Sequence, residues 1–160
     1  MSHDTRIGSD ERSRCAWVGS DAEYERYHDE EWGTPLRGDR ALFEKIALEG
    51  FQAGLSWITI LRKRPRFREV FDGFDPAIIA AYDDDDIARL MADAGIVRNR
   101  SKIEATISNA KLVEAMPPGE LEALLWSFAP AAHVPPSSFA EVPAVTLESE
   151  AMSKALRKRG

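Results

Sequence analysis

The sequence predicts an all-α protein that forms a single compact helical domain. Apolar residues recur at helical spacing along most of the 160-residue chain, and convincing alternating strand patterns are absent. No internal repeat and no long linker divides the chain, whose length is enough for one domain with a real core. Hydrophobic residues make up 44% and charged residues 30%, which is typical of a soluble globular protein.

The N-terminal sequence, the cysteine content and the net charge limit where this protein can be located and what it can bind. No apolar run approaches membrane-spanning length, and residues 1–14 lack the apolar core of a signal peptide. We expect residues 1–14 to be a disordered extension and residues 15–160 to form the domain. Cys15 is the only cysteine, so an intrachain disulfide is excluded and the cytoplasm is favoured. The net charge of -6 argues against nucleic-acid binding by overall charge but leaves binding by one face possible.

Capping residues and breaks divide the first half of the chain into helices. The first helix begins at Ser20 or Asp21 and stops near residues 33–35. The second runs from Asp39 to Ala53; Asp39 can cap its start, and Gly54 can end it in a left-handed conformation.

The next helices follow from the same signals. Ser56 can cap a helix that we expect Pro65 to interrupt. Asp75 then caps a short helix with Pro76 at its first position, and Asp83 or Asp84 caps another.

The last third of the chain contains three more helices. One follows the turn at Gly95 and passes through residues 103–115, and the next covers residues 120–128 after a Pro-Pro-Gly break. Residues 129–145 are rich in Pro, Ala and Ser and are predicted to form a loop. Thr146 or Ser149 caps the final helix.

Glu49 and Trp57 flank the Gly54 break and are the first candidates for a functional site. Glu49 lies at the edge of the apolar face of its helix, where a carboxylate loses much of its water and needs a cation or a donor. Trp57 can turn back toward that helix end, and an anion beside an aromatic face suits a flat cationic ligand. The alternative is a surface Glu49 paired with Lys45, four residues earlier, with Trp57 in the core.

The turn at Gly95 is the second candidate. Gly95 is followed by two apolar residues and then by Arg98, Arg100 and Lys102 at the start of a helix. Free N–H groups at a helix start attract phosphate, and nearby cations position a DNA backbone without reading its sequence. This arrangement is similar to a helix-hairpin-helix motif, in which Ile96 and Val97 would be buried. A plain pair of helices joined by a tight turn is the alternative.

Two further groups have either a structural or a functional interpretation. Cys15 and His28 are residue types that bind zinc, but a lone Cys and a lone His are more often incidental. The aromatic residues between positions 17 and 32 are either core or the walls of a base-binding pocket. They are Trp17, Tyr24, Tyr27 and Trp32.

Taken together, these stretches resemble the 3-methyladenine DNA glycosylase I family from Cys15 to Gly160, in consistent order and spacing. The matching stretches are residues 15–17 (CAW), 24–33 (YERYHDEEWG), 42–44 (LFE), 48–59 (LEGFQAGLSWIT), 74–76 (FDP), 93–103 (DAGIVRNRSKI), 126–128 (WSF) and 153–160 (SKALRKRG).

The resemblance implies a helix-hairpin-helix DNA glycosylase fold and excision of 3-methyladenine from alkylated double-stranded DNA. It implies that Glu49 contacts the flipped base, that Tyr24, Tyr27 and Trp57 surround it, and that Trp32 lies nearby. The family is monofunctional and uses water. Lys45 is the only lysine near Glu49, and we expect it to face away from the apolar stripe.

The resemblance also implies a structural zinc ion with Cys15 and His28 as two of its four ligands. The other two, a His and a Cys, lie in the family shortly after the segment that matches residues 158–160, where this sequence ends. His133 is not at a matching position. We therefore expect half of the zinc site in a chain shorter than its family.

The expected protein is a cytoplasmic monomer that does not associate with membranes. Excision by such an enzyme exploits the positive charge that N3-methylation gives adenine, because the charge weakens the glycosidic bond and is attracted by aromatic faces and a carboxylate. Two alternatives remain at this point: a helix-hairpin-helix module that binds DNA without catalysis, and a zinc-dependent enzyme that uses Cys15 and His28.

Overall fold

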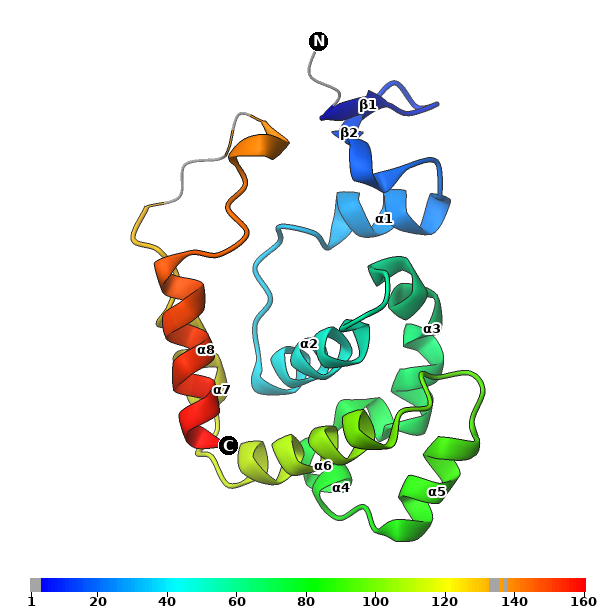
Figure 1. Ribbon diagram of the computed structural model, residues 1–160, viewed down its shortest axis with the longest axis vertical. Coiled ribbons are helices and arrows are strands. Elements are labelled where there is room, and N and C mark those ends of the chain that lie inside the picture. The colour runs from blue at the N-terminus through cyan, green and yellow to red at the C-terminus, as the bar shows by residue number, and fades with distance from the viewer. Residues whose placement is uncertain (1–3, 133–135, 137) are drawn as a thin grey trace.

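The computed structural model describes residues 4–132, 136 and 138–160, most of which are helical (Figure 1). The helices are α1 (Ala22–Glu30), α2 (Asp39–Gln52), α3 (Trp57–Val70), α4 (Pro76–Ala80), α5 (Asp84–Ala92), α6 (Arg100–Glu114), α7 (Glu120–Trp126) and α8 (Leu147–Arg159). Short 3-10 helices are η1 (Ala16–Val18), η2 (Asp72–Phe74) and η3 (Phe139–Glu141). The all-α prediction is confirmed, since the strands among the described residues are only β1 (Thr5–Ile7) and β2 (Ser13–Cys15).

The expectation that residues 1–14 are disordered is wrong for the described part of that segment. β1 and β2 pair antiparallel, and Arg14 from β2 is only 5% exposed. Its guanidinium forms ion pairs of 2.6 Å with Asp10 and 2.7 Å with Asp29 of α1. These contacts fasten the hairpin to α1, and they hold the pKa of both carboxyl groups well below the usual range. Composition alone does not reveal such a cross-chain partner.

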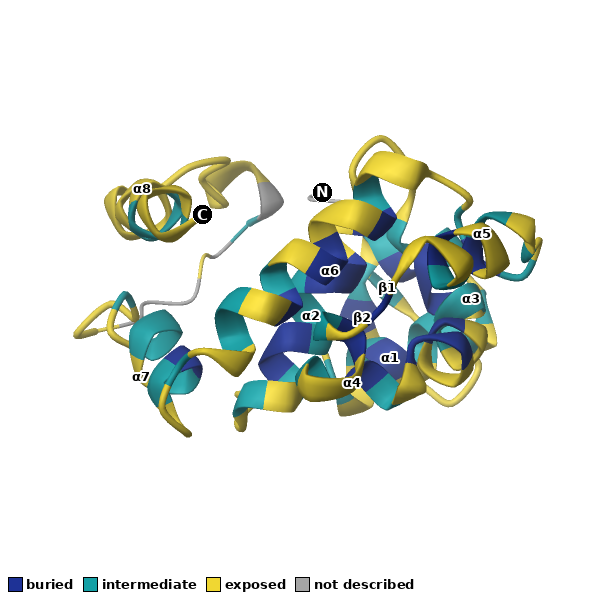
Figure 2. Ribbon diagram, turned by 90° about the horizontal axis from the view of Figure 1, so that it is seen from below, coloured by how far each residue is buried: buried dark blue, intermediate teal, exposed yellow. Residues whose placement is uncertain are grey.

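The core lies among α2, α3, α4 and α6, whose inner faces are buried (Figure 2). Phenylalanines dominate it: the rings of Phe51 and Phe67 are 4.7 Å apart, and Phe71 and Phe74 stack at 5.5 Å. Aromatic pairs at these distances add stabilisation beyond the burial of their area. The core therefore fixes α2 and α3, which lead to and from the Gly54 break.

Most of the predicted helix caps are confirmed. Asp21, Asp75 and Asp83 each accept hydrogen bonds from backbone N–H groups at the start of their helices. Thr146 forms a capping box with Ser149 at the start of α8. Gly54 has φ of +84° after the end of α2, as expected.

Three predictions about helix ends are wrong. Ser56 precedes α3, but its hydroxyl makes no capping hydrogen bond and instead lies 2.8 Å from the Thr59 hydroxyl. Asp39 does not cap α2; its carboxylate accepts hydrogen bonds from the N–H groups of Gly119 and Glu122 and so caps α7 instead. Pro65 does not interrupt α3, which runs unbroken through it. Buried Phe67 and Val70 follow Pro65, so core packing maintains the helix despite one missing backbone hydrogen bond.

The turn at Gly95 joins α5 and α6, and this pair of helices connected by a tight turn is the predicted arrangement. Ile96 is buried in the core and Val97 packs against it, half-buried. Asn99 caps α6 by accepting a hydrogen bond from the N–H of Lys102. The hairpin thus lies against α3, where Lys63 donates hydrogen bonds to the carbonyls of Ala94 and Gly95.

The final helix, α8, lies outside the group formed by α2 to α6 (Figure 1). None of its described side chains is buried, although Met152, Ala155 and Leu156 are partly covered as the sequence predicts. In the described part of the chain, no helix has both the length and the apolar character needed to cross a bilayer.

Candidate active site

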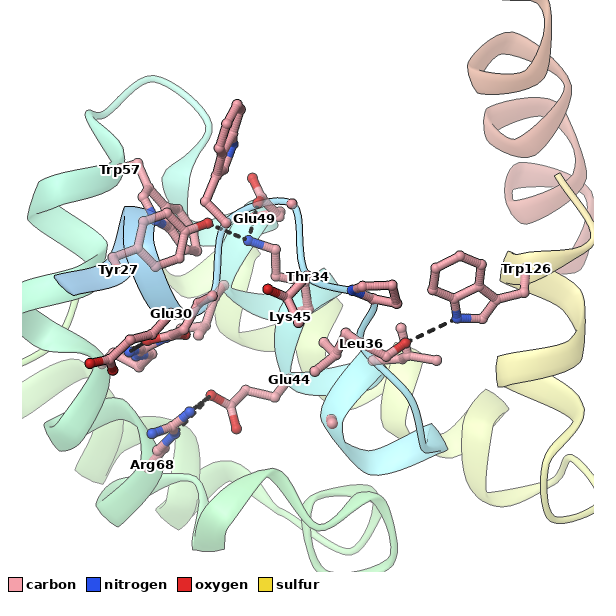
Figure 3. Close-up of a pocket in the computed structure, with 18 residues that line it drawn as sticks. Tyr27, Glu30, Thr34, Leu36, Glu44, Lys45, Glu49, Trp57, Arg68 and Trp126 are labelled. Carbon is pink, nitrogen blue, oxygen red and sulfur yellow. Dashed lines mark hydrogen bonds and ion pairs between the residues drawn. The ribbon is translucent and has the colours of Figure 1, made fainter. Parts of the chain in front are cut away.

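A cavity of about 570 Å³ lies beside α2 (Figure 3). Its walls come from α1, α2, α3 and the loop after α1, with Trp126 of α7 at one side. Tyr27, Lys45, Glu49 and Trp57 lie together along it. The volume is within the range of cavities that bind small ligands and is larger than a purine base.

Glu49 lies at this cavity, but its surroundings differ from the prediction. The side chain is 50% exposed, and its carboxylate forms an ion pair with the Lys45 ammonium at 2.8 Å. The expected loss of water at Glu49 is therefore wrong, because its position on α2 faces the open cavity and not the packed core. The predicted alternative of a Lys45 pair, one helical turn apart, is the arrangement observed.

Trp57 and Tyr27 form the aromatic wall. Their ring centroids are 5.7 Å apart, and Tyr27 is buried. The Trp57 indole N–H is also buried, and it has no acceptor among the described residues. A buried donor without a partner is uncommon and marks a place where a polar partner would be favourable. The turn at Gly54 brings Trp57 back beside α2, as the sequence predicts.

Trp32 and Tyr24 are the other two aromatic residues predicted around the base. Trp32 lines the cavity, and its side chain stacks on the His28 ring at a centroid distance of 5.5 Å. Tyr24 does not line it; its hydroxyl accepts a 3.1 Å hydrogen bond from the N–H of Ile58 in the first turn of α3. Tyr24 therefore positions the helix that begins with Trp57.

Two ion pairs that the sequence does not predict line the cavity. Arg64 binds Glu31 through two hydrogen bonds of 2.6 and 2.7 Å, and Arg68 binds Glu44 at 2.8 Å. The Arg64 bond lowers the pKa of Glu31 below its ordinary value, and the pKa of Arg64 is raised in turn. In the sequence Glu31 belongs to an acidic run (residues 29–31), and Arg64 and Arg68 belong to a basic one (residues 62–68). A solvated face is the default interpretation of such runs.

The position of Lys45 in the cavity is not predicted from the sequence, which indicates only that it faces away from the apolar stripe of α2. Its ammonium lies 4.0 Å from the centroid of the Trp57 ring and 3.4 Å from the Tyr27 hydroxyl. The signal that identifies it is its spacing of four residues before Glu49, which puts both side chains on one face.

Cys15 and His28, the two predicted zinc ligands, are neighbours in the structure. The backbone N–H of Cys15 donates to His28 Nε2 at 3.4 Å, while His28 Nδ1 lies 3.0 Å from an Asp29 carboxylate oxygen. A carboxylate at the second ring nitrogen is the usual support for a metal-binding histidine. Among the described residues, however, no group of three or more His, Cys, Asp or Glu side chains is arranged to hold a metal. Cys15 and His28 alone would be two of the four ligands that a structural zinc takes, and His3 and His133 lie outside the described residues.

Two of the residues predicted to face a DNA backbone are engaged within the protein. The N–H of Gly95 donates to the Asp93 side chain at 2.7 Å. The Lys102 ammonium donates to the carbonyls of Phe51 and Ala53 at 2.9 and 2.6 Å, at the end of α2. Both groups are thus occupied by internal partners.

The other two residues predicted to face a DNA backbone, Arg98 and Arg100, are on the surface of the hairpin. Arg98 is exposed, and the structure records no ion pair for it within the described residues. Arg100 is exposed and pairs with Glu104 at 3.3 Å, one turn along α6. Such exposed pairs are weak, so both guanidinium groups are accessible to an external anion.

Comparison with known proteins places this arrangement in context. The chain is 48% identical over 153 residues to DNA-3-methyladenine glycosylase 1 of Escherichia coli (strain K12), an alignment that covers 92% of this chain and 81% of that protein. Among solved structures, a crystal structure of 3-methyladenine DNA glycosylase I matches with a TM-score of 0.84 at 46% identity, covering 92% of this chain and 83% of the other. A variant of 3-methyladenine DNA glycosylase I in complex with 3-methyladenine matches with a TM-score of 0.82 at 35% identity, covering 92% and 81%.

The helical fold and the cavity beside α2 thus occur in a chain that is closely similar to these enzymes over nearly all of its length. The family model described as methyladenine glycosylase matches residues 17–160, and the chain therefore belongs to the methyladenine glycosylase family.

Proposed function

We propose that this protein is a DNA glycosylase that excises 3-methyladenine from alkylated DNA by hydrolysis and leaves an abasic site. The observation that carries the proposal is the cavity in which the Glu49 carboxylate lies beside the faces of Trp57 and Tyr27. Membership of the methyladenine glycosylase family supports the same activity.

The lesion base suits this cavity because of its charge. N3-methylation makes the adenine of the nucleoside cationic, which weakens its glycosidic bond and impairs pairing, so extrusion from the duplex is easier. The aromatic faces attract the cation, and the Glu49 carboxylate accepts charge-assisted hydrogen bonds from the base edge. Neutral adenine receives neither benefit, which favours the lesion over the parent base.

Water is the proposed nucleophile. Lys45 lines the cavity, and its ammonium pairs with the Glu49 carboxylate at 2.8 Å in the free protein. A protonated amine has no electron pair with which to attack the sugar and form a Schiff base. Together with membership of the methyladenine glycosylase family, this favours a monofunctional hydrolysis.

The proposed substrate is alkylated double-stranded DNA, bound by a monomer in the cytoplasm. Arg98 and Arg100 on the hairpin are the proposed contacts to its backbone, because their guanidinium groups are exposed. Gly95 and Lys102 act instead by holding the hairpin and α2 in place.

We also propose that Cys15 and His28 are two ligands of a structural zinc ion, a role that would tie β2 to α1. Metal analysis of the purified protein and of Cys15→Ala tests this: with two of the four ligands present, we expect weak, less than stoichiometric zinc binding in the first and less still in the second. Equal zinc content would contradict it. Base release that persists after exhaustive chelation excludes a zinc-dependent reaction and leaves a structural role.

Mass spectrometry of the bases released from methylated duplex DNA tests the proposed reaction. The protein is expected to release 3-methyladenine without releasing adenine. Glu49→Gln and Trp57→Ala are expected to reduce the rate by about 100-fold or more, since each removes interactions that favour the cation. Duplex binding without any base release would instead support a non-catalytic DNA-binding module.

A further inference from the structure

Lys45 places a positive charge inside the cavity. It lies on α2 one turn before Glu49, and its ammonium is within contact of three groups of the candidate site (Figure 3). These are the Glu49 carboxylate at 2.8 Å, the Tyr27 hydroxyl at 3.4 Å and the face of Trp57, whose centroid is 4.0 Å away. The ammonium therefore has an anion, a hydroxyl and an aromatic face as partners.

These partners are the ones that a cationic base would use. A cation over an aromatic face is attracted by the ring quadrupole, and a carboxylate adds a direct charge interaction. The Trp57 face and Glu49 Oε1 are already in contact with the Lys45 ammonium. A second cation cannot take the same contacts while the ammonium is present, because like charges at that distance repel.

The other cations that line the cavity make two contacts each with their carboxylates. Arg64 is 11% exposed and binds Glu31 through two hydrogen bonds. Arg68 is 50% exposed, but two of its nitrogens lie 2.8 Å from Glu44 Oε1, and the pair lies away from Tyr27 and Trp57 (Figure 3). Lys45 is 39% exposed and makes one direct contact with its carboxylate. Exposed pairs of this kind are weak, and a lysine side chain has many accessible rotamers. Lys45 is therefore the cation of the cavity that a ligand can displace.

We propose that Lys45 is a specificity-determining residue that occupies the cation subsite of the free enzyme and has to leave it when the methylated base binds. This inference rests on the proposed function. In the free protein Lys45 balances the charge of Glu49, and in the complex the base takes over that role. Binding of a cationic base thus includes the displacement of Lys45. The displaced ammonium stays nearby because it is tethered to α2, and its charge disfavours binding of a cationic base more than binding of a neutral one.

Binding of two small probes tests this inference. One is 3,9-dimethyladeninium, which carries the positive charge of the lesion with a methyl group in place of the sugar, and the other is neutral 9-methyladenine. Their affinities are measured by calorimetry for the unaltered protein, Lys45→Met, Lys45→Arg and Lys111→Met. The last is a matched control that removes an exposed lysine of α6 lining a different cavity.

Lys45→Met is expected to bind the cation about tenfold more tightly, since it loses the competing ion pair and cation–π contact. The affinity for 9-methyladenine is expected to change less, Lys45→Arg to remain close to the unaltered protein, and Lys111→Met to show no change. Unchanged or weaker cation binding by Lys45→Met would overturn the inference, as would equal gains for both probes.

A structure of the unaltered protein with 3,9-dimethyladeninium provides an independent readout that requires no variant. The Lys45 ammonium is expected to have left both Glu49 and the Trp57 face, and its retention between them would overturn the inference. Base release from methylated DNA, measured in parallel, separates the two proposals. Release of 3-methyladenine with no gain in Lys45→Met refutes only the role of Lys45, whereas absence of release and of probe binding refutes both.

Discussion

At the scale of single residues, Glu49 remains available to a ligand because its partner within the protein is weak. Its pair with Lys45 is half exposed and spans one helical turn, an arrangement worth a few tenths of a kcal/mol in isolated helices. A flat cation that also stacks on Trp57 is partly removed from water, where its interactions are stronger. The carboxylate can therefore exchange one cation for another at small cost.

Tyr24 illustrates a residue that matters to the site without touching the ligand. Tyr24→Phe removes the acceptor of the Ile58 N–H at the start of α3, which is expected to lower the free energy of unfolding by about 1 kcal/mol. The affinity for 3,9-dimethyladeninium is expected to stay nearly unchanged, because the ring remains and does not line the cavity. Chemical unfolding and calorimetry on the same sample measure both quantities. Unchanged stability with a large loss of affinity would show that the hydroxyl contacts the base.

At the scale of elements, the end of α2 and the start of α6 are joined by one lysine. The Lys102 ammonium donates to two carbonyls that the end of α2 leaves without helical partners. A positive group at a helix carboxyl end is also favoured by the helix dipole. This link holds the Gly54 break, and hence Trp57, against the helix-hairpin-helix turn.

Lys102→Met and Arg98→Met are expected to have different effects, although both remove one positive charge from the hairpin. Lys102→Met is expected to lower the free energy of unfolding by about 1–2 kcal/mol, since two carbonyls lose a charged donor. Arg98→Met is expected to leave stability nearly unchanged and to reduce the salt slope of duplex binding by about one. Urea unfolding and a salt series of DNA binding distinguish them, and exchanged outcomes would reverse the two assignments.

The Arg64–Glu31 pair connects the end of α1 to α3 and makes stability depend on pH. Since Arg64 lowers the folded-state pKa of Glu31 below its ordinary 4.5, the pair stabilises the protein above that pH. This contribution is lost as the pH falls through the lowered pKa.

Glu31→Gln is expected to be less stable than the unaltered protein at neutral pH and to lose less stability on acidification. Urea unfolding at neutral pH and at a pH below 4.5 measures this difference. Glu114→Gln, at an exposed position near the end of α6, is the matched control. Parallel pH dependences for the unaltered protein and Glu31→Gln would show that the pair does not contribute.

At the scale of the whole molecule, the parts of the fold that depend on neighbouring residues could be predicted from the sequence. The helix starts at Asp21, Asp75 and Asp83 depend on hydrogen bonds within the first turn. The left-handed end at Gly54 is equally local. These signals are enough to give the helix order and to bring Glu49 and Trp57 together.

The features that the sequence could not reveal depend on partners far away along the chain. Asp39 caps α7, about 80 residues later, and Arg14 binds Asp29 of another element. Pro65 remains helical because the core holds the residues that follow it. Lys45 reaches Trp57 only once α2 and α3 are folded, so its place in the cavity depends on tertiary packing.

The overall charge of -6 also requires that DNA bind through a limited surface. Exposed cations separated by more than about 8 Å act almost independently at physiological salt. The proposed binding of DNA therefore rests on local groups such as Arg98 and Arg100 and not on a general attraction.

The measurement that tests the central claim most directly is the preference for a positively charged purine in the unaltered protein and in Glu49→Gln. Calorimetry with 3,9-dimethyladeninium and 9-methyladenine gives this preference as a ratio of two affinities. The unaltered protein is expected to prefer the cation by about tenfold or more, and Glu49→Gln to lose most of that preference. The same preference in both proteins, or none in the unaltered protein, would contradict selection of the lesion by its charge.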